Sequence, residues 1–262
     1  MVQLIQDTLQ ALKPITLAEM DSVKLMSRSD EKYLCRIDQL PDLLKLAQRD
    51  FQVLENVGKR IFGYESMYLD TPGHEMYLAH HNGKLNRYKV RIREYQETGE
   101  TFFEIKFKNN KRETGKKRTA INSDRDYGST SIRTFMKKHS PYLPEMLQPV
   151  LYSSFKRITL VNKMLAERIT IDLIPAWQFE GRSASLPRVV VMEVKSSRPS
   201  GSSGFGYLLR EARIMPRRIS KYCIGTALLY PEIKHNRFKS KLLELNKLNK
   251  SITYHEPNHA VV

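Results

Sequence analysis

Apolar and charged side chains alternate along a segment near the middle of the chain. Basic residues occupy every second position there, namely Arg87, Lys89, Arg91 and Arg93. The positions between them carry Tyr88, Val90 and Ile92. Because successive side chains of a strand point to opposite faces, the pattern predicts a strand with one core face and one cationic face.

Three further segments, 103–108, 168–172 and 192–195, repeat this alternation. Their charged or polar positions are Glu104, Lys106, Lys108, Arg168, Thr170, Asp172, Glu193 and Lys195. The residues between these positions are apolar, for example Ile105, Ile171 and Val194. The segments therefore predict strands whose charged faces combine into one surface.

The remaining elements follow from periodicity and from turn signals such as Asn82-Gly83 and Thr98-Gly99. Strands are predicted over 28–36, 51–55, 61–69, 86–95, 101–108, 116–122, 150–160, 167–174 and 188–194. Helices are predicted over 4–12, 71–80, 129–139, 205–215 and 220–229, and over a segment that Asp38 caps and that ends near 48. A mobile loop over 196–206 and a basic amphipathic tail over 231–250 complete the prediction.

The charge distribution on the predicted strands indicates a ligand. Alternation by itself is typical of a solvated outer face of an antiparallel sheet. Such a face mixes signs, whereas here like charges follow one another from Arg87 to Arg93 beside Lys106 and Lys108. A bound polyanion would relieve this repulsion, and closure of the sheet would gather the cations in a lumen. We therefore expect an α+β fold, a closed antiparallel β-barrel tunnel with flanking helices.

Composition adds limits on the partner and the compartment. Lys and Arg number 44 against 28 Asp and Glu, and the net charge of +16 attracts nucleic acid, anionic lipid or condensed phosphate alike. Cys35 and Cys223 lie far apart and outside any CxxC or Cys/His cluster, which favours a reducing cytoplasm over a disulfide framework or a zinc site. No apolar run approaches the roughly 20 residues of a transmembrane helix. We expect a soluble cytoplasmic chain, at most peripheral to a membrane.

Short fragments in a specific order give the chain a family resemblance over about Arg28 to Leu229. They are Glu31-Lys32-Tyr33, Tyr68-Leu69-Asp70-Thr71, Lys89-Val90-Arg91-Ile92-Arg93, Phe103-Glu104-Ile105-Lys106, Phe155-Lys156-Arg157, Arg168-Ile169-Thr170-Ile171-Asp172, Val191-Met192-Glu193-Val194-Lys195 and Ser220-Lys221-Tyr222. With them the chain resembles the catalytic domain of the VTC (vacuolar transporter chaperone) family. These are polyphosphate polymerases within the CYTH or triphosphate tunnel metalloenzyme superfamily.

The resemblance implies roles for individual residues. Those expected to act in catalysis by holding phosphate are Arg91, Arg93, Lys106, Arg157 and Lys221. Further phosphate-binding residues are Lys32, Arg168 and Ser220, together with Lys89 from its place on the cationic face. Tyr222 and Ser220 would support Lys221 at the end of the tunnel, although an ordinary capping serine also explains Ser220.

The carboxylates on the charged faces have alternative interpretations. By the resemblance Glu193 holds a divalent metal, and a carboxylate that faces a cationic lumen is well placed to bind Mn²⁺ or Mg²⁺. The alternative for Glu193 is a salt bridge to a neighbouring Arg or Lys. Glu104 lies beside Lys106 and suits either a metal ligand or an orienting partner for that lysine, and we favour the orienting role.

The sequence departs from the family pattern at two positions. Arg28 stands where the hydrolytic relatives carry the first acidic residue of an ExExK motif, which disfavours their multi-carboxylate metal site. Phe155 stands where VTC domains often have Tyr, so a hydroxyl contact is not expected there.

The expected activity is an ATP:polyphosphate phosphotransferase, with ATP and inorganic polyphosphate as partners. A triphosphatase and a noncatalytic polyphosphate-binding subunit are the alternatives. Nucleic acid is disfavoured because aromatic residues do not interleave the basic strands on their charged face, as a base-stacking platform would require. We expect a helical extension over 1–27, the tunnel domain over 28–230 and a basic helical tail over 231–262. A membrane-protein partner and the oligomeric state are left open.

Overall fold

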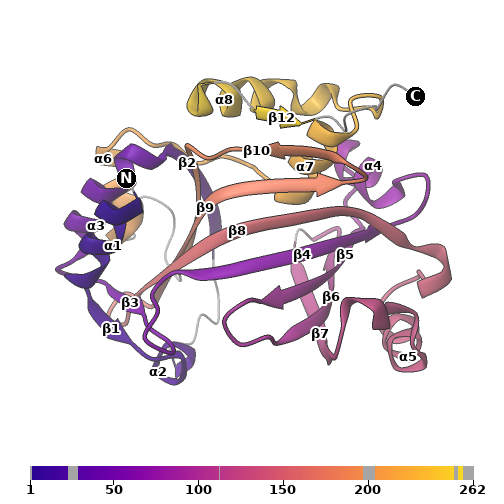
Figure 1. Ribbon diagram of the computed structural model, residues 1–262, viewed down its shortest axis with the longest axis horizontal. Coiled ribbons are helices and arrows are strands. Elements are labelled where there is room, and N and C mark those ends of the chain that lie inside the picture. The colour runs from indigo at the N-terminus through magenta and orange to yellow at the C-terminus, as the bar shows by residue number, and fades with distance from the viewer. Residues whose placement is uncertain (1, 23–28, 112, 197–203, 251–252, 256–262) are drawn as a thin grey trace, which may run out of the picture.

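An antiparallel sheet dominates the computed structural model, which describes residues 2–22, 29–111, 113–196, 204–250 and 253–255 (Figure 1). Its main strands follow the spatial order β7–β6–β5–β4–β8–β9–β11–β2. They are β2 (Ser29–Arg36), β4 (Phe62–Asp70), β5 (Arg87–Tyr95), β6 (Thr101–Lys108), β7 (Thr114–Ile121), β8 (Gln148–Asn162), β9 (Glu167–Phe179) and β11 (Val189–Ser196). The strands predicted over 61–69, 86–95, 101–108 and 116–122 are confirmed, and they pair antiparallel in chain order as β4 to β7.

Short strands extend the sheet at two places. One pair, β10 (Arg182–Ser185) and β12 (Thr253–His255), continues antiparallel from β9. The other pair, β1 (Lys13–Ile15) and β3 (Gln52–Leu54), lies beside β8, and its own pairing is parallel. The strands β1, β10 and β12 were not predicted, because segments of three or four residues are too short to show a period.

The closed barrel predicted from the sequence is not confirmed. In the part of the chain that the structure describes, no backbone pairing joins β2 to β7, the two ends of the main sheet. The outer edge of β2 is occupied instead, since the Arg217 N–H donates to the Lys32 carbonyl at 2.6 Å and Pro216 bridges to Tyr33. The outer edge of β7 carries exposed Lys and Arg side chains, which oppose edge-to-edge pairing.

The sheet is nevertheless strongly curved. Lys89 of β5 and Asp172 of β9 are separated by two strands, yet both contact the start of one helix, α7 (Lys221–Leu229). The faces of these strands therefore look toward a common space, which we call the lumen. Twist and coiling of antiparallel strands produce such a curvature.

The apolar residues of the alternating strands lie on the outer face of the sheet, as predicted. Val90, Ile92 and Ile105 are buried together with Ile132 of α5 (Thr130–His139). The Ser129 hydroxyl caps α5 by accepting the Ile132 N–H at 3.4 Å, which confirms the predicted start of this helix.

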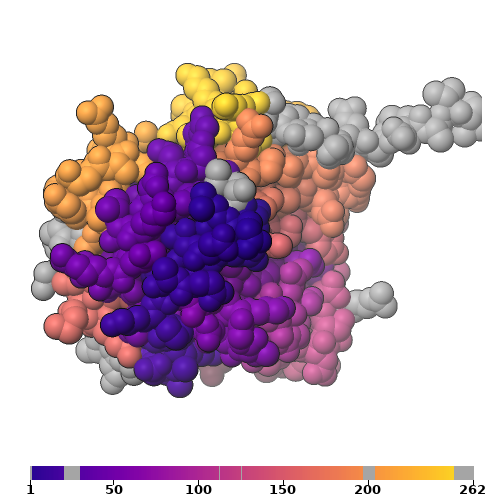
Figure 2. Space-filling model, turned by 60° about the vertical axis from the view of Figure 1, so that its left-hand side comes forward, coloured from indigo at the N-terminus to yellow at the C-terminus, as the bar shows by residue number. Residues whose placement is uncertain are grey.

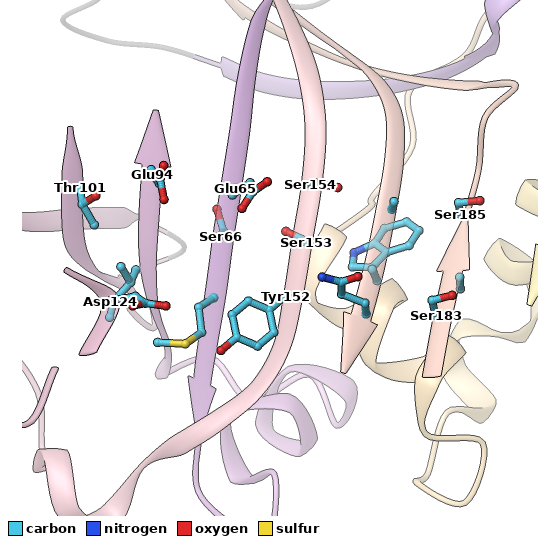
Figure 3. A pocket seen from close by; sticks show the side chains of 16 residues that line it. Glu65, Ser66, Glu94, Thr101, Asp124, Tyr152, Ser153, Ser154, Ser183 and Ser185 are labelled. Atoms are coloured by element: carbon cyan, nitrogen blue, oxygen red, sulfur yellow. The ribbon is translucent and has the colours of Figure 1, made fainter. Parts of the chain in front are cut away.

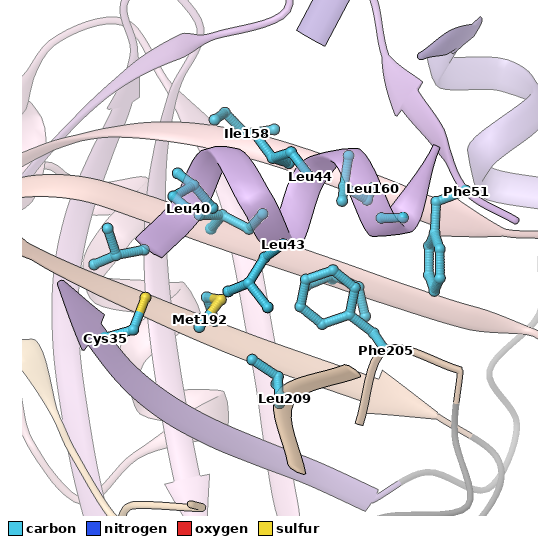
Figure 4. Packing of buried hydrophobic residues seen from close by; sticks show 14 of the residues in the cluster. Cys35, Leu40, Leu43, Leu44, Phe51, Ile158, Leu160, Met192, Phe205 and Leu209 are labelled. Atoms are coloured by element: carbon cyan, nitrogen blue, oxygen red, sulfur yellow. The ribbon is translucent and has the colours of Figure 1, made fainter. Parts of the chain in front are cut away.

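A second cluster covers the outer face of β8, β9 and β11. The helices that cover it are α1 (Val2–Gln10), α3 (Leu40–Ala47) and α6 (Gly204–Glu211). Leu44 of α3 and Phe205 of α6 pack in one cluster with Ile158 and Met192 (Figure 4). The space-filling view shows the N-terminal segments spread over this side of the molecule (Figure 2). The prediction that Asp38 caps a helix is wrong, because Asp38 binds the Arg36 guanidinium within a 3₁₀ turn that precedes α3.

One end of the lumen is filled by α7. This helix packs with α4 (Glu75–His81) and α8 (Lys239–Asn249) around buried Tyr77 and Phe238. Gly225 of α7 lies directly against the Trp177 indole, where a Cβ atom would be 2.3 Å from the ring. At the opposite end, α2 (Leu17–Ser22) brings Met20 onto Phe62 and Val161.

Some predictions concern segments that the structure treats differently or does not describe. The predicted loop over 196–206 falls largely outside the described residues. The tail predicted from 231 is helical only over η4 (Asn236–Phe238) and α8. Among the described residues, no helix is both long and apolar enough to cross a membrane. The division of the chain at 27 and 230 stays a prediction.

Candidate functional site

Basic side chains form rows across the lumenal face. Backbone register places Lys89 of β5 opposite Lys106 of β6, and Lys106 opposite Lys116 of β7. In the described part of the chain the Lys106 ammonium has no hydrogen bond or ion pair. The pKa of Lys106 lies well below its ordinary value. The causes are the charge of Arg91, the burial of the lysine side chain and the charge of Arg93. The β5–β6 wall is therefore short of negative charge.

Glu104 is the carboxylate of this wall and is fully buried. It accepts hydrogen bonds from Arg91 Nε at 2.7 Å and from Lys116 Nζ at 3.1 Å. Burial alone would raise the pKa of Glu104, but Arg91, Arg93 and Lys116 together hold it well below its usual range. Both oxygens are engaged, so the contacts are those of an orienting carboxylate, with Arg91 rather than Lys106 as its partner.

Asp172 organises the opposite wall. Arg157 of β8 donates to it through Nε at 2.6 Å and Nη2 at 2.8 Å, and the Lys221 ammonium contacts the same carboxylate. Burial would raise the pKa of Asp172, but Arg157 and Lys221 lower it well below its usual range. Asp172 was not among the predicted site residues. The sequence shows that Asp172 alternates with apolar residues, but it does not show that Arg157 and Lys221 are its partners.

Glu193 forms the salt bridge that was its alternative interpretation, with its Oε1 2.6 Å from Lys32 Nζ. Burial would raise the pKa of Glu193, but Lys32 and Lys195 lower it to about 2. Its cross-strand neighbour is Thr170, whose buried hydroxyl has no hydrogen-bond partner among the described residues. An ionised carboxylate beside an unpaired hydroxyl offers the hard oxygen ligands that Mg²⁺ and Mn²⁺ prefer.

The described residues contain no cluster of three or more His, Cys, Asp or Glu side chains that could hold a metal ion. A divalent ion at Glu193 would therefore need further oxygen ligands from a bound phosphate. Such sharing between one or two carboxylates and substrate phosphates is the usual arrangement for Mg²⁺ in proteins.

The N-terminus of α7 faces the lumen. The Ser220 hydroxyl caps the helix by accepting the Cys223 N–H at 3.4 Å, and it also accepts from Lys89 Nζ at 3.0 Å. The capping interpretation of Ser220 is thus confirmed, and the residue lies beside a lumenal cation. The Tyr222 hydroxyl donates instead to Asp70, which also accepts N–H groups of α4, so Tyr222 joins two helices rather than supporting Lys221.

Arg168 lies toward the α2 end of the lumenal face, two residues along β9 from Thr170. Its Nη2 donates to the Met20 carbonyl at 2.8 Å, at the end of the lumen where α2 packs. The structure therefore brings together the remaining set, which is Lys32, Lys89, Arg91, Arg93, Lys106, Arg157, Glu193, Ser220 and Lys221.

The lumenal face also carries residues that the sequence analysis missed. Lys116 and Arg118 of β7 lie opposite Lys106 and Glu104. In β7 polar residues occupy both faces, so alternation could not assign them, and only the pairing register does.

Aromatic rings lie among the cations, contrary to prediction. Tyr64 stacks on Phe155 with ring centroids 5.3 Å apart, and Arg157 lies over both rings at 4.8 and 5.1 Å. Tyr95 and Phe102 continue this row onto β5 and β6. The reason given against nucleic-acid binding, an absence of aromatic residues from the charged face, is therefore wrong.

A cavity of about 500 Å³ lies on the opposite face of the sheet (Figure 3). Its lining includes Glu65 and Glu94, which are paired across β4 and β5, and Asp124. Hydroxyl groups of Tyr152 and several serines complete the surface. Its carboxylates would repel a polyanion, so this cavity is distinct from the cationic site.

The family model described as VTC domain matches residues 27–230. No curated protein matches the sequence. Among solved structures, a candidate adenylate cyclase from Vibrio parahaemolyticus is 12% identical, with a TM-score of 0.44 and coverage of 75% of this chain and 97% of that one.

Two further structures are similar to the same degree. A candidate adenylate cyclase from Bacillus halodurans is 12% identical, with a TM-score of 0.47 and coverage of 74% and 96% of the two chains. A candidate adenylyl cyclase from Hippeastrum, described as having a dominant triphosphatase activity, is 11% identical, with a TM-score of 0.48 and coverage of 77% and 96%.

Proposed function

Because this chain belongs to the VTC domain family, we propose that it is a polyphosphate polymerase that transfers the γ-phosphoryl group of ATP to the end of an inorganic polyphosphate chain. The observation that carries the proposal is the charge balance of the lumen. Its carboxylates Glu104, Asp172 and Glu193 are all engaged in ion pairs. Arg93, Lys89 and Lys106 have no acidic partner among the described residues. A condensed phosphate supplies the missing negative charge.

Both walls of the lumen carry proposed phosphate ligands. Arg91, Arg93 and Lys106 approach from β5 and β6, while Arg157 and Lys221 approach from the opposite side. Arginine fits phosphate oxygens bidentately, and lysine adds point charge. Glu104 and Asp172 hold their arginines in fixed orientations, so little reorganisation is needed when phosphate binds.

Transfer requires positioning and charge stabilisation more than covalent chemistry from the protein. A terminal oxygen of the polyphosphate attacks the γ-phosphorus of ATP, the bond from that phosphorus to the β–γ bridging oxygen breaks, and ADP leaves with that electron pair. The acceptor is already ionised, so no side chain has to remove a proton. Lumenal cations stabilise the charge on the transferring group.

When bound, a divalent cation, Mn²⁺ or Mg²⁺, would offset the negative charge of the phosphate groups. Glu193 would hold it, with the unpaired Thr170 hydroxyl as its neighbour. Lys32 would then exchange its carboxylate partner for a phosphate oxygen.

The state of the carboxylates favours a phosphate acceptor over water. A triphosphatase needs a group that takes a proton from the attacking water. Ion pairing lowers the pKa of Glu193 to about 2. It also holds the pKa values of Glu104 and Asp172 well below their usual range. Such carboxylates are weak general bases. ATP as the donor, together with buried free thiols at Cys35 and Cys223, fits a reducing cytoplasm.

The test is incubation of the purified chain with ATP and Mn²⁺, with polyphosphate resolved on a gel while ADP and orthophosphate are quantified. We expect long chains and an equal amount of ADP. Orthophosphate without chains would instead indicate the triphosphatase. Tripolyphosphate binding without turnover would indicate a binding subunit.

Single-residue variants test whether polyphosphate synthesis depends on lumenal side chains. Arg93→Ala should abolish chain synthesis, and Glu193→Gln should reduce it and weaken its dependence on Mn²⁺. The matched control is Lys137→Ala on the last turn of α5, outside the lumen. Full-rate synthesis by Glu193→Gln would contradict the metal role of this residue.

A further inference from the structure

A continuous row of aromatic rings crosses the lumenal face at one level. Phe155, Tyr64 and Tyr95 lie opposite one another on β8, β4 and β5. Tyr64 and Tyr95 have centroids 5.0 Å apart, and Tyr95 meets Phe102 of β6 edge-on at 5.8 Å and 85°. The row ends beside the β5–β6 turn, since Tyr95 is the last residue of β5.

The two halves of the row have different surroundings. Over Phe155 and Tyr64 lie the guanidinium groups of Arg157 and Arg93, and the Lys221 ammonium is 4.3 Å from the Phe155 centroid. These cations are the proposed phosphate ligands. The phosphate end of a nucleotide therefore belongs over this half.

The other half offers stacking surfaces. Tyr95 and Phe102 are half-buried, and exposed Arg118 of β7 places its guanidinium carbon 4.5 Å from the Phe102 centroid. An arginine plane on an aromatic ring is a platform on which nucleobases stack. Tyr95 is two residues from Arg93, which corresponds to about 7 Å along a strand.

We propose that Tyr95, Phe102 and Arg118 form a nucleobase site, which holds the base of a nucleoside triphosphate while Arg93, Arg157 and Lys221 hold its phosphates. The inference rests on the proposed function, because it takes the lumen to be a triphosphate site. It makes the nucleotide, rather than inorganic triphosphate, the preferred donor. It also fixes the donor's direction, with the base at the β5–β6 turn.

The experiment compares ATP with inorganic tripolyphosphate by isothermal titration calorimetry on the full chain. Phe102→Leu removes the ring, and Arg118→Lys keeps the charge but removes the plane. Loss of base stacking should weaken ATP binding by roughly 5- to 150-fold and leave tripolyphosphate binding within about twofold. Phe107→Leu, on the outer face of the same strand against Tyr88, is the matched control and should change neither affinity.

Other outcomes would overturn the inference. Equal weakening of both ligands would mean that the rings only position the phosphate-binding cations. Unchanged ATP affinity in both variants would mean that the base lies elsewhere. If the unmodified chain binds neither ligand, the proposed function itself fails. Thermal unfolding of each variant separates a binding effect from a folding defect.

Discussion

Arg157 and Asp172 face each other across β8 and β9 and form two parallel hydrogen bonds, of 2.6 and 2.8 Å. The Lys221 ammonium of α7 joins the same carboxylate. One aspartate therefore ties the helix that fills the end of the lumen to the wall that presents Arg157. Arg157 and Lys221 thus stabilise the fold through Asp172, and they are also proposed phosphate ligands.

Asp172→Asn should lower the free energy of unfolding by about 3–5 kcal/mol, because it leaves two largely buried cations without their counter-charge. Urea unfolding measures the change. Added tripolyphosphate should recover part of the loss by supplying negative charge to Arg157 and Lys221. A variant as stable as the unmodified chain would show that the ion pairs contribute little.

The stability of the chain should fall in acid. The pKa of Glu193 is lowered from 4.5 to about 2 in the folded protein, so its contribution is complete above pH 4.5 and is lost as the pH falls toward 2. Glu104 and Asp172 act in the same direction. Urea unfolding at successive pH values should show a smaller acid loss for Glu193→Gln than for the unmodified chain. Identical profiles would contradict the assignment.

Lys106 should take up protons when a polyanion binds. Neighbouring cations and burial hold its pKa well below the ordinary value, and bound phosphate would raise it. Calorimetric titration with tripolyphosphate in buffers of different ionisation enthalpy measures this uptake, which Lys106→Met should abolish or reduce. Uptake of the same size in the variant would place the proton elsewhere.

The same variant should separate stability from binding. Lys106→Met removes a buried amine whose charged form the neighbouring cations disfavour, so we expect the unfolding free energy to rise by about 0.5–2 kcal/mol. Tripolyphosphate affinity should fall roughly 10- to 150-fold with the loss of one charge-assisted contact. Lys138→Met, on the last turn of α5 outside the lumen, is the control.

Gly225→Ala should destabilise the chain even though alanine favours helices. Its Cβ would lie 2.3 Å from the Trp177 ring, and overpacking of this kind costs about 1–3 kcal/mol. Gly115→Ala on β7 meets no atom within 4 Å and should leave stability nearly unchanged. Thermal unfolding of the two variants makes the comparison, and equal melting temperatures would contradict the close packing of α7.

The sequence by itself determined which side of each long strand is charged. The period of two is a local property of an extended chain, so Arg91, Arg93 and Lys106 could be assigned to one face before any pairing was known. The same reasoning identified Val90, Ile92 and Ile105 as core. Ser220 was recognisable as a helix cap for an equally local reason.

Only the tertiary structure decided which charged groups meet. Asp172 finds Arg157 and Lys221 because of the β8–β9 register and the docking of α7, and neither is encoded in the alternation around Asp172. Arg168 has the same alternation, yet it is bound at the α2 end of the lumen. The opening between β2 and β7 likewise depends on a remote segment, Pro216-Arg217, that covers the edge of β2. Local periodicity specifies faces, whereas register, edge coverage and helix docking are long-range contacts that arise only when the chain folds.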